Sequence, residues 1–89
     1  MLNLDLQTIK HVHFVGIGGI GISAVARMML HEGKIVTGQD MQEGEIVKEL
    51  KKLGIDIKIG QSYENIPEDA ELIVYTIAID NYDPELAKK

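Results

Sequence analysis

The stretch from His11 to Leu30 decides the fold, and it reads HVHFV-GIGGIG-ISAVARMML. Its first five residues are β-branched, aromatic or histidine and end at a glycine, which predicts a buried β-strand. Residues 20–30 are rich in alanine, methionine and leucine, which favour a helix. A glycine-rich turn (residues 16–21) that leads from a strand into a helix predicts an α/β fold of the dinucleotide-binding type.

The glycines of residues 16–21 have distinct expected roles. Gly16 permits a tight turn, Gly18 lets a diphosphate approach the backbone, and Gly21 lets the helix pack closely on the strand. Gly19 widens the same bare surface. The N–H groups from Gly19 to Ile22 then face the anion, with the helix dipole behind them. The loop therefore predicts a site for the diphosphate of a nucleotide-linked ligand, and the alternative is a purely structural turn.

The remaining segments alternate between strand and helix. Residues 34–38, 55–59 and 72–76 predict strands, residues 43–53 predict an amphipathic helix, and Pro84 is expected to open a further helix. The helix at residues 20–30 is apolar nearly all round and is expected to be covered on most sides. Such alternation means a parallel sheet with right-handed crossovers. We therefore expect a Rossmann-like three-layer α/β domain with a parallel sheet of about four to five strands.

Composition limits the possible functions. A chain of 89 residues is long enough for one domain, and its net charge of -5 argues against nonspecific nucleic-acid binding. The absence of cysteine excludes disulfides, thiolate metal sites and a cysteine nucleophile. We see no secretory signal and no apolar run long enough to cross a bilayer, so we expect a cytoplasmic protein without a membrane partner.

Two polar residues follow predicted strands at the edge where α/β domains bind ligands. Asp40 lies about 20 residues after the glycine loop, where an acidic side chain binds a ribose in nicotinamide-binding folds. Its alternative role is a turn or helix cap. Thr76 follows the fourth predicted strand. Ser23 lies in the helix near the loop, where its hydroxyl could contact phosphate.

The histidines are expected to be structural. His11 and His13 share one face of a strand, but the sequence offers no third ligand nearby, so we expect no metal site. His11 is expected at the strand start, and His13 is expected to pack or hydrogen-bond within the domain. Met28 and Met29 are expected in the core, and Tyr75 is expected to be packed on the sheet. With no Ser-His-Asp arrangement and no P-loop lysine, no catalytic residue is assigned.

The segment from His13 to Ser23 resembles the N-terminal signature of the UDP-N-acetylmuramate–L-alanine ligases, a branch of the Mur ligase family of peptidoglycan synthesis. Later segments agree in the same order. Residues 36–40 are similar to V-x-G-S-D, 53–55 to L-G-I, 60–62 to G-H-S, 76–79 to S-S-A-I and 81–85 to D-N-P-E. The chain departs from the family's residues at Gln39, Gln61 and Thr76-Ile77.

The resemblance implies the first of three domains, which binds UDP-N-acetylmuramic acid on a Rossmann-like sheet. The glycine loop would lie near the diphosphate, Asp40 near the uridine, and Thr76 and Ala78 near the phosphate or sugar. The implied substrate-binding residues are Gly16, Gly18, Gly19, Ile20, Gly21, Ser23, Asp40, Thr76 and Ala78.

In such ligases, ATP and Mg²⁺ bind the central domain, and the C-terminal domain helps to bind L-alanine. The resemblance thus implies that residues 1–89 hold no cofactor and are inactive alone. Two alternatives remain at this stage. One is an NAD-binding domain of an oxidoreductase or regulator, with Asp40 on a ribose. The other is a structural domain that has lost ligand binding.

Overall fold

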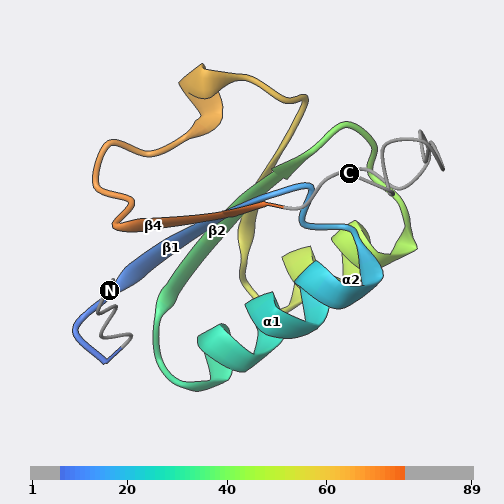
Figure 1. Cartoon of the computed structure of the whole chain (residues 1–89). Coiled ribbons are helices and arrows are strands. Elements are labelled where there is room, and N and C mark those ends of the chain that lie inside the picture. Colours follow the sequence, from blue (N-terminus) through green and yellow to red (C-terminus); the bar gives the residue numbers. More distant parts are fainter. Residues whose placement is uncertain (1–6, 76–89) are drawn as a thin grey trace, which may run out of the picture.

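The computed structural model describes residues 7–75 of the chain. Its elements are β1 (His11–Val15), α1 (Ile20–His31), β2 (Ile35–Asp40), α2 (Glu45–Lys52), β3 (Asp56–Ile59), the 3₁₀-helix η1 (Tyr63–Asn65) and β4 (Leu72–Tyr75). The strands form one parallel sheet in the order β3-β2-β1-β4 (Figure 1). This arrangement confirms the α/β fold that the glycine loop and the alternating pattern predict.

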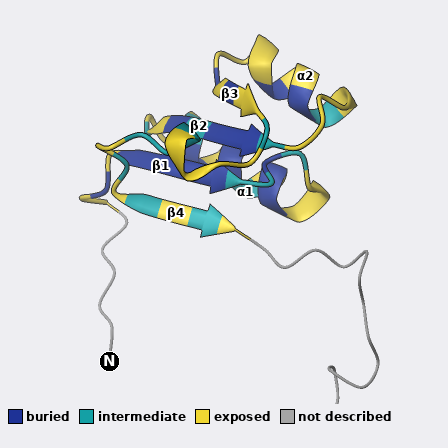
Figure 2. Ribbon diagram, turned by 90° about the horizontal axis from the view of Figure 1, so that it is seen from above, coloured by how far each residue is buried: buried dark blue, intermediate teal, exposed yellow. Residues whose placement is uncertain are grey.

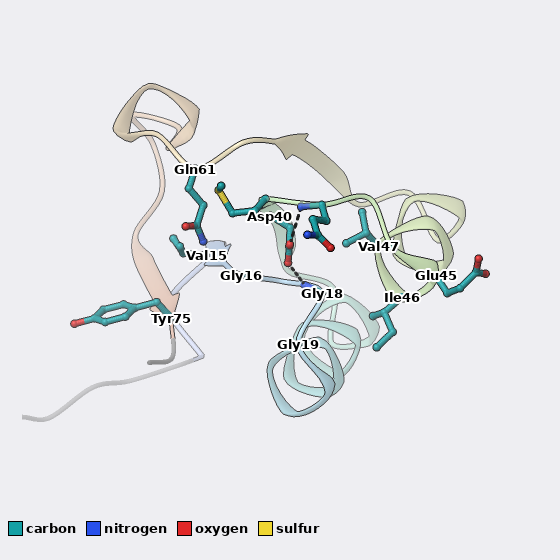
Figure 3. Close-up of a pocket in the computed structure, with 13 residues that line it drawn as sticks. Val15, Gly16, Gly18, Gly19, Asp40, Glu45, Ile46, Val47, Gln61 and Tyr75 are labelled. Atoms are coloured by element: carbon teal, nitrogen blue, oxygen red, sulfur yellow. Dashed lines mark hydrogen bonds between the residues drawn. The ribbon is translucent and has the colours of Figure 1, made fainter. Parts of the chain in front are cut away.

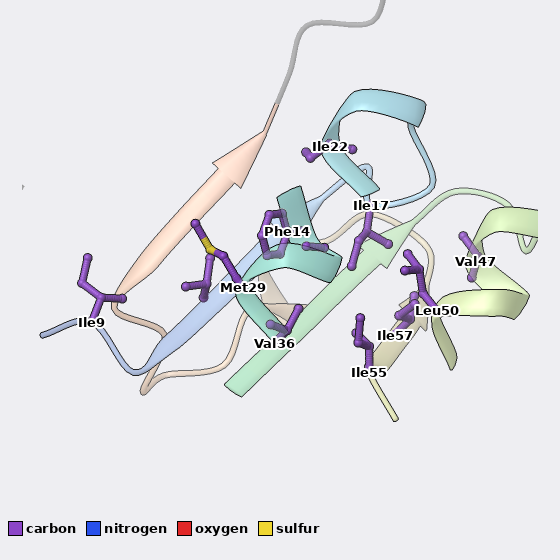
Figure 4. Close-up of a cluster of buried hydrophobic side chains, with 12 residues drawn as sticks. Ile9, Phe14, Ile17, Ile22, Met29, Val36, Val47, Leu50, Ile55 and Ile57 are labelled. Atoms are coloured by element: carbon purple, nitrogen blue, oxygen red, sulfur yellow. The ribbon is translucent and has the colours of Figure 1, made fainter. Parts of the chain in front are cut away.

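The core lies between the sheet and the two α-helices, which cover the same face of the sheet. Because successive strand residues point to opposite faces, Val12 and Phe14 of β1 face the helices while His11 and His13 face away. Phe14 and Ile17 are fully buried. The buried apolar cluster comprises Ile9, Val12, Phe14, Ile17, Ile22, Ala26, Met29, Val36, Val47, Leu50, Ile55 and Ile57 (Figure 4).

The opposite face of the sheet is covered by the segment between β3 and β4, which carries η1. Side chains of β1 and β2 on this face hydrogen-bond to Ser62 of the segment and lie beside its Asp69. As a result His13 and Gln39 are buried although no α-helix of residues 7–75 covers them (Figure 2). The third layer of the domain is therefore irregular in the described part of the chain.

Element boundaries differ from the predicted ones at β2 and α2. The sequence predicts a strand that ends at Gly38, but β2 continues to Asp40 because Gln39 pairs with Val15 and Asp40 pairs with Ile59. The second helix begins at Glu45, two residues later than predicted, with Gly44 as its N-cap. The fourth strand is described to Tyr75, and the helix predicted from Pro84 lies outside the described residues.

Burial of three apolar side chains was predicted wrongly. Helix α1 was expected to be covered on most sides, yet Ile20 is 83% and Met28 is 53% exposed. Only Met29 of the methionine pair lies in the core. Tyr75 is 70% exposed because it ends β4, the edge strand of the described sheet. Helix α1 touches the sheet and α2 with one side, and none of the elements in residues 7–75 covers its other side.

Gly38 of β2 lies against Ile17, and this contact generates a prediction. A Cβ at position 38 would lie 2.5 Å from Ile17 Cδ1 and 3.0 Å from Ile17 Cβ. We expect Gly38→Ala to lower the free energy of unfolding by about 1–3 kcal/mol through overpacking. Urea denaturation followed by circular dichroism measures the change. Gly21→Ala is the matched control, because a Cβ there meets nothing within 4 Å, and equal losses in both variants would refute the prediction.

Glu71 joins the start of β1 to the start of β4. Its Oε1 accepts hydrogen bonds from the N–H groups of Lys10 at 2.8 Å and His11 at 3.1 Å. These hydrogen bonds hold the pKa of the Glu71 carboxyl below its usual value of 4.5. A lowered pKa in the folded state means that the carboxylate stabilises the fold above the unfolded pKa. That contribution is lost as the pH falls through the folded pKa.

We therefore expect Glu71→Gln to be less stable than the parent chain at about pH 7, and the difference to shrink towards about pH 3. Denaturation curves recorded across this pH range test the prediction. Glu68→Gln is the control, since Glu68 is an exposed glutamate of the same segment. A stability difference that does not change with pH would contradict the assigned role of Glu71.

Candidate functional site

A cleft of about 920 Å³ opens at the carboxyl edge of the sheet (Figure 3). The glycine loop forms one side, the end of β2 with Asp40 forms the floor, and the start of α2 from Glu45 to Val47 forms the other side. We call this hollow the large cleft. Ligands of parallel α/β domains bind at this edge, so the cleft lies where the sequence predicts a site.

The glycine loop is folded back onto the end of β2. Gly16 has a φ of +76°, a conformation that favours glycine, as expected for the tight turn. The N–H groups of Gly16 and Ile17 both donate to the carbonyl of Gln39, at 2.9 and 3.1 Å. The N–H of Gly19 donates to the carbonyl of Gly16 at 3.1 Å. These bonds fix the path of the backbone into α1.

The amino end of α1 carries no capping side chain. Gly19 is the N-cap, and the first turn holds no acidic residue. The N–H groups of Ile20, Gly21 and Ile22 therefore lack an acceptor within the helix, and they form its positive end beside the loop. The predicted packing role of Gly21 is wrong, because a Cβ at that position would meet nothing within 4 Å.

Ser23 turns its hydroxyl into the helix. Its Oγ donates to the carbonyl of Ile20 at 2.9 Å, and the residue is 5% exposed. Its N–H donates to the carbonyl of Gly19 at 2.8 Å. Both donors of Ser23 are thus engaged inside the protein in this structure.

Asp40 binds the glycine loop directly. Its Oδ2 accepts the N–H of Gly18 at 2.8 Å, and its Oδ1 accepts the N–H of Gln42 at 3.1 Å (Figure 3). A Cβ on Gly18 would lie 2.9 Å from Oδ2. The bare surface above Gly18, where the sequence predicts a diphosphate, is therefore occupied by a carboxylate of the chain itself. Asp40 also serves as the turn cap that was its alternative role.

A smaller cleft of about 320 Å³ adjoins the large cleft. Val15 and Gln61 line both hollows, and Gln39, Ser62, Tyr63 and Ile66 complete the smaller one. The sequence indicates that Gln39 and Gln61 are departures from a family pattern at the ligand ends of strands, but Ser62 was missed. The signal that could have found Ser62 is its position close after a predicted strand, and thus at the ligand edge. Thr76 and Ala78 lie outside the described residues.

The histidines of β1 bind other side chains. His13 is fully buried and hydrogen-bonds to Thr37 and Gln39, as predicted. Within residues 7–75, no group of three or more histidine and acidic side chains is placed to hold a metal ion. Within the same residues, no helix is long and apolar enough to span a membrane.

Comparisons with known proteins agree on one family. The family model described as "Mur ligase family, catalytic domain" matches residues 11–89. A UDP-N-acetylmuramate–L-alanine ligase of Acetivibrio thermocellus is 49% identical over 85 residues, which are 96% of this chain and 18% of that protein. A ligase of the same name from Clostridium botulinum strain Eklund 17B is 51% identical over 77 residues, or 86% of this chain and 16% of that protein.

Structural comparison gives the same result. The crystal structure of UDP-N-acetylmuramate-alanine ligase from Thermotoga maritima matches with a TM-score of 0.71 and 39% sequence identity. The match covers 90% of this chain and 18% of that one. The chain therefore spans less than a fifth of the length of these relatives.

The Asp40 carboxylate is expected to hold the glycine loop in place. Asp40→Ala leaves the N–H groups of Gly18 and Gln42 without their acceptor, so we expect a loss of about 1–3 kcal/mol in the free energy of unfolding. Amide hydrogen exchange should accelerate at Gly18 and Gln42. Asp56→Ala is the control, because Asp56 is an exposed aspartate on β3. Unchanged exchange at both amides would show that Asp40 does not restrain the loop.

Proposed function

Since the chain belongs to the Mur ligase family, we propose that residues 1–89 form the domain that binds UDP-N-acetylmuramic acid in a UDP-N-acetylmuramate–L-alanine ligase. The observation that carries the proposal is the uncapped amino end of α1, which follows the glycine loop at the edge of the large cleft. Free N–H groups at a helix start bind phosphate without any cationic side chain. The names of the relatives supply the sugar nucleotide and the amino acid.

The diphosphate is proposed to bind the N–H groups of Ile20 and Gly21, next to Gly19. The N–H of Gly18 is already engaged by Asp40, and the negative charge of that carboxylate disfavours a phosphate directly above it. The diphosphate is thus shifted from the middle of the loop towards the helix start. This position also agrees with the bare backbone at residues 19 and 21.

The nucleoside is proposed to lie on the Asp40 side of the large cleft. Each carboxylate oxygen accepts one backbone N–H and retains a further lone pair for a ribose hydroxyl or a base N–H. Ile46 offers apolar surface to the flat face of a base. Asp40 thereby favours ligands that present hydrogen-bond donors, and disfavours anionic groups, at this point.

Catalysis is assigned outside residues 1–89. The sequence contains no Gly-x-x-x-x-Gly-Lys-[Ser/Thr] loop, so we propose that ATP and Mg²⁺ bind elsewhere in the complete ligase. The complete enzyme is proposed to join the lactyl carboxyl of the sugar nucleotide to L-alanine by ATP-dependent amide formation in peptidoglycan synthesis. The proposed role of this chain is to hold the nucleotide and its diphosphate. We expect no ligation by the chain alone.

An NMR titration of the ¹⁵N-labelled chain tests the binding function. UDP-N-acetylmuramic acid and UDP should both shift the amide signals of residues 18–23 and of Asp40, and NAD should leave them unchanged. The same shifts with NAD alone would favour the nicotinamide alternative. If none of the three ligands shifts these amide signals, nucleotide binding by this chain is rejected.

Substitution at Ile20 isolates a single phosphate-binding amide. Proline is tolerated at the first helical position, and Gly19 before it is already extended, with φ -67° and ψ 149°. Ile20→Pro therefore removes one N–H while preserving α1, and we expect about tenfold weaker UDP binding. Ile20→Ala keeps the N–H and is the control, since the Ile20 side chain is 83% exposed. Equal affinities would place the diphosphate elsewhere.

A further inference from the structure

A network of polar side chains is buried on the face of the sheet opposite the α-helices. His11 Nε2 and His13 Nδ1 lie 2.9 and 2.8 Å from Thr37 Oγ1. His13 Nε2 lies 2.7 Å from Gln39 Oε1, and Gln39 Nε2 donates to the carbonyl of Ser62 at 3.4 Å. Because His13 is 0% and Gln39 is 2% exposed, water is excluded from the hydrogen bond between these two side chains. We call these five residues the polar network.

At the Ser62 end of the network, the donor and the acceptor of each hydrogen bond can be assigned. A backbone carbonyl only accepts hydrogen bonds, so the NH₂ group of Gln39 faces Ser62 and Gln39 Oε1 faces His13. His13 must then carry a hydrogen on Nε2. Gln39 thus hydrogen-bonds both to His13 of the sheet and to Ser62 of the segment that covers the sheet.

At the other end, the network lacks a hydrogen when its side chains are neutral. The contacts run from Asp69 through His11, Thr37 and His13 to Gln39. A hydrogen bond at every one of these contacts would need one more hydrogen than the two neutral imidazoles and the threonine hydroxyl supply. His11 Nδ1 is the buried atom left without a hydrogen bond, although Asp69 Oδ1 lies 3.2 Å away. The Gln39 end is therefore the end at which every donor and acceptor of the network is matched.

Gln61 is held from both sides. On one side, the N–H of Gly60 donates to the carbonyl of Asp40 at 2.7 Å. On the other side, Ser62 accepts from Gln39, and its carbonyl also accepts the N–H of Asn65 at 3.0 Å. Gln61 itself lines both the large and the smaller cleft. Residues 60–66, which we call the wall segment, thus contribute Gln61 to the lining of both hollows.

We propose that Gln39 is a positioning residue for the large cleft: its side-chain amide holds the Ser62 carbonyl and thereby fixes Gln61 as a wall of the nucleotide site. The same residue uses its backbone carbonyl to bind the N–H groups of Gly16 and Ile17. One residue therefore binds both the glycine loop and the wall segment. The proposal rests on nucleotide binding in the large cleft, but it does not depend on which sugar the nucleotide carries.

Gln39→Glu tests the proposal, because it keeps the size of the side chain and an acceptor for His13 but replaces the donor that faces Ser62. We expect faster amide exchange at Asn65 and Ile66 and about fivefold weaker UDP binding. The ¹⁵N signature of a His13 hydrogen on Nε2 should persist. Lys52→Gln is the control for the change in charge, since Lys52 is exposed in the last turn of α2.

A pH profile separates positioning from a general loss of structure. In the Gln39→Glu chain, protonation of the introduced carboxyl restores a donor for Ser62, so exchange protection of the wall segment should return on acidification. The parent chain should show no such gain. The titratable groups that face position 39 through the polar network are His13 and, beyond Thr37, His11, whose ¹⁵N signals report their own protonation in the same spectra.

Gln61→Ala is the second variant, because it removes the wall without touching the polar network. It should weaken UDP binding while amide exchange at Asn65 and Ile66 stays as in the parent chain. Unchanged exchange in Gln39→Glu, or faster exchange with unchanged UDP affinity, would overturn the proposal. Weaker UDP binding with unchanged exchange would also overturn it, since Gln39 would then contact the ligand directly. If the parent chain fails to bind UDP, the proposed function fails, while exchange measured without ligand still decides whether Gln39 restrains the wall segment.

Discussion

The carboxyl end of β2 holds together the described loops at the functional edge of this domain. The carbonyl of Gln39 accepts two N–H groups of the glycine loop, and the carbonyl of Asp40 accepts the N–H of Gly60. Because neighbouring strand residues point to opposite faces, the Asp40 side chain reaches Gly18 on the helical face while that of Gln39 reaches Ser62 on the other. Two consecutive residues thus bind loops that are far apart in the sequence.

This arrangement shapes the chemistry that the edge offers a ligand. Among the residues that the structure describes, the lining of the large cleft contains two carboxylates, Asp40 and Glu45, and no lysine or arginine. A diphosphate must therefore rely on backbone N–H groups and on the dipole of α1. Asp40 occupies the N–H of Gly18, so the loop donors left for an anion among the described residues are the N–H groups at the start of α1.

Local patterns in the sequence were sufficient to predict the order of the elements, because the glycine loop and the alternation of strand and helix are encoded by neighbouring residues. Contacts between distant residues were not predictable in this way. Gly38 reads as the end of a strand, yet it lies inside β2, because Gln39 pairs with Val15 and Asp40 pairs with Ile59. The hydrogen bond from the N–H of Gly18 to the Asp40 carboxylate joins residues 22 positions apart. No local pattern therefore reveals that these two predicted ligand-binding residues bind each other. Composition likewise predicted an apolar α1 but not which of its sides is covered.

The strand order also has a kinetic consequence. Strand β1 pairs with β4 through contacts about 60 residues apart in sequence, and parallel pairing over such separations is slow to form. The wall segment lies between β3 and β4. The connection that carries it is therefore held at both ends once β4 has joined the sheet and the carboxylate of Glu71 has bound the start of β1. During synthesis, a nascent chain that has emerged as far as β3 holds a glycine loop and a floor but no wall. The described lining of the large cleft, which includes Tyr75, is therefore completed by the last strand of the described sheet to leave the ribosome.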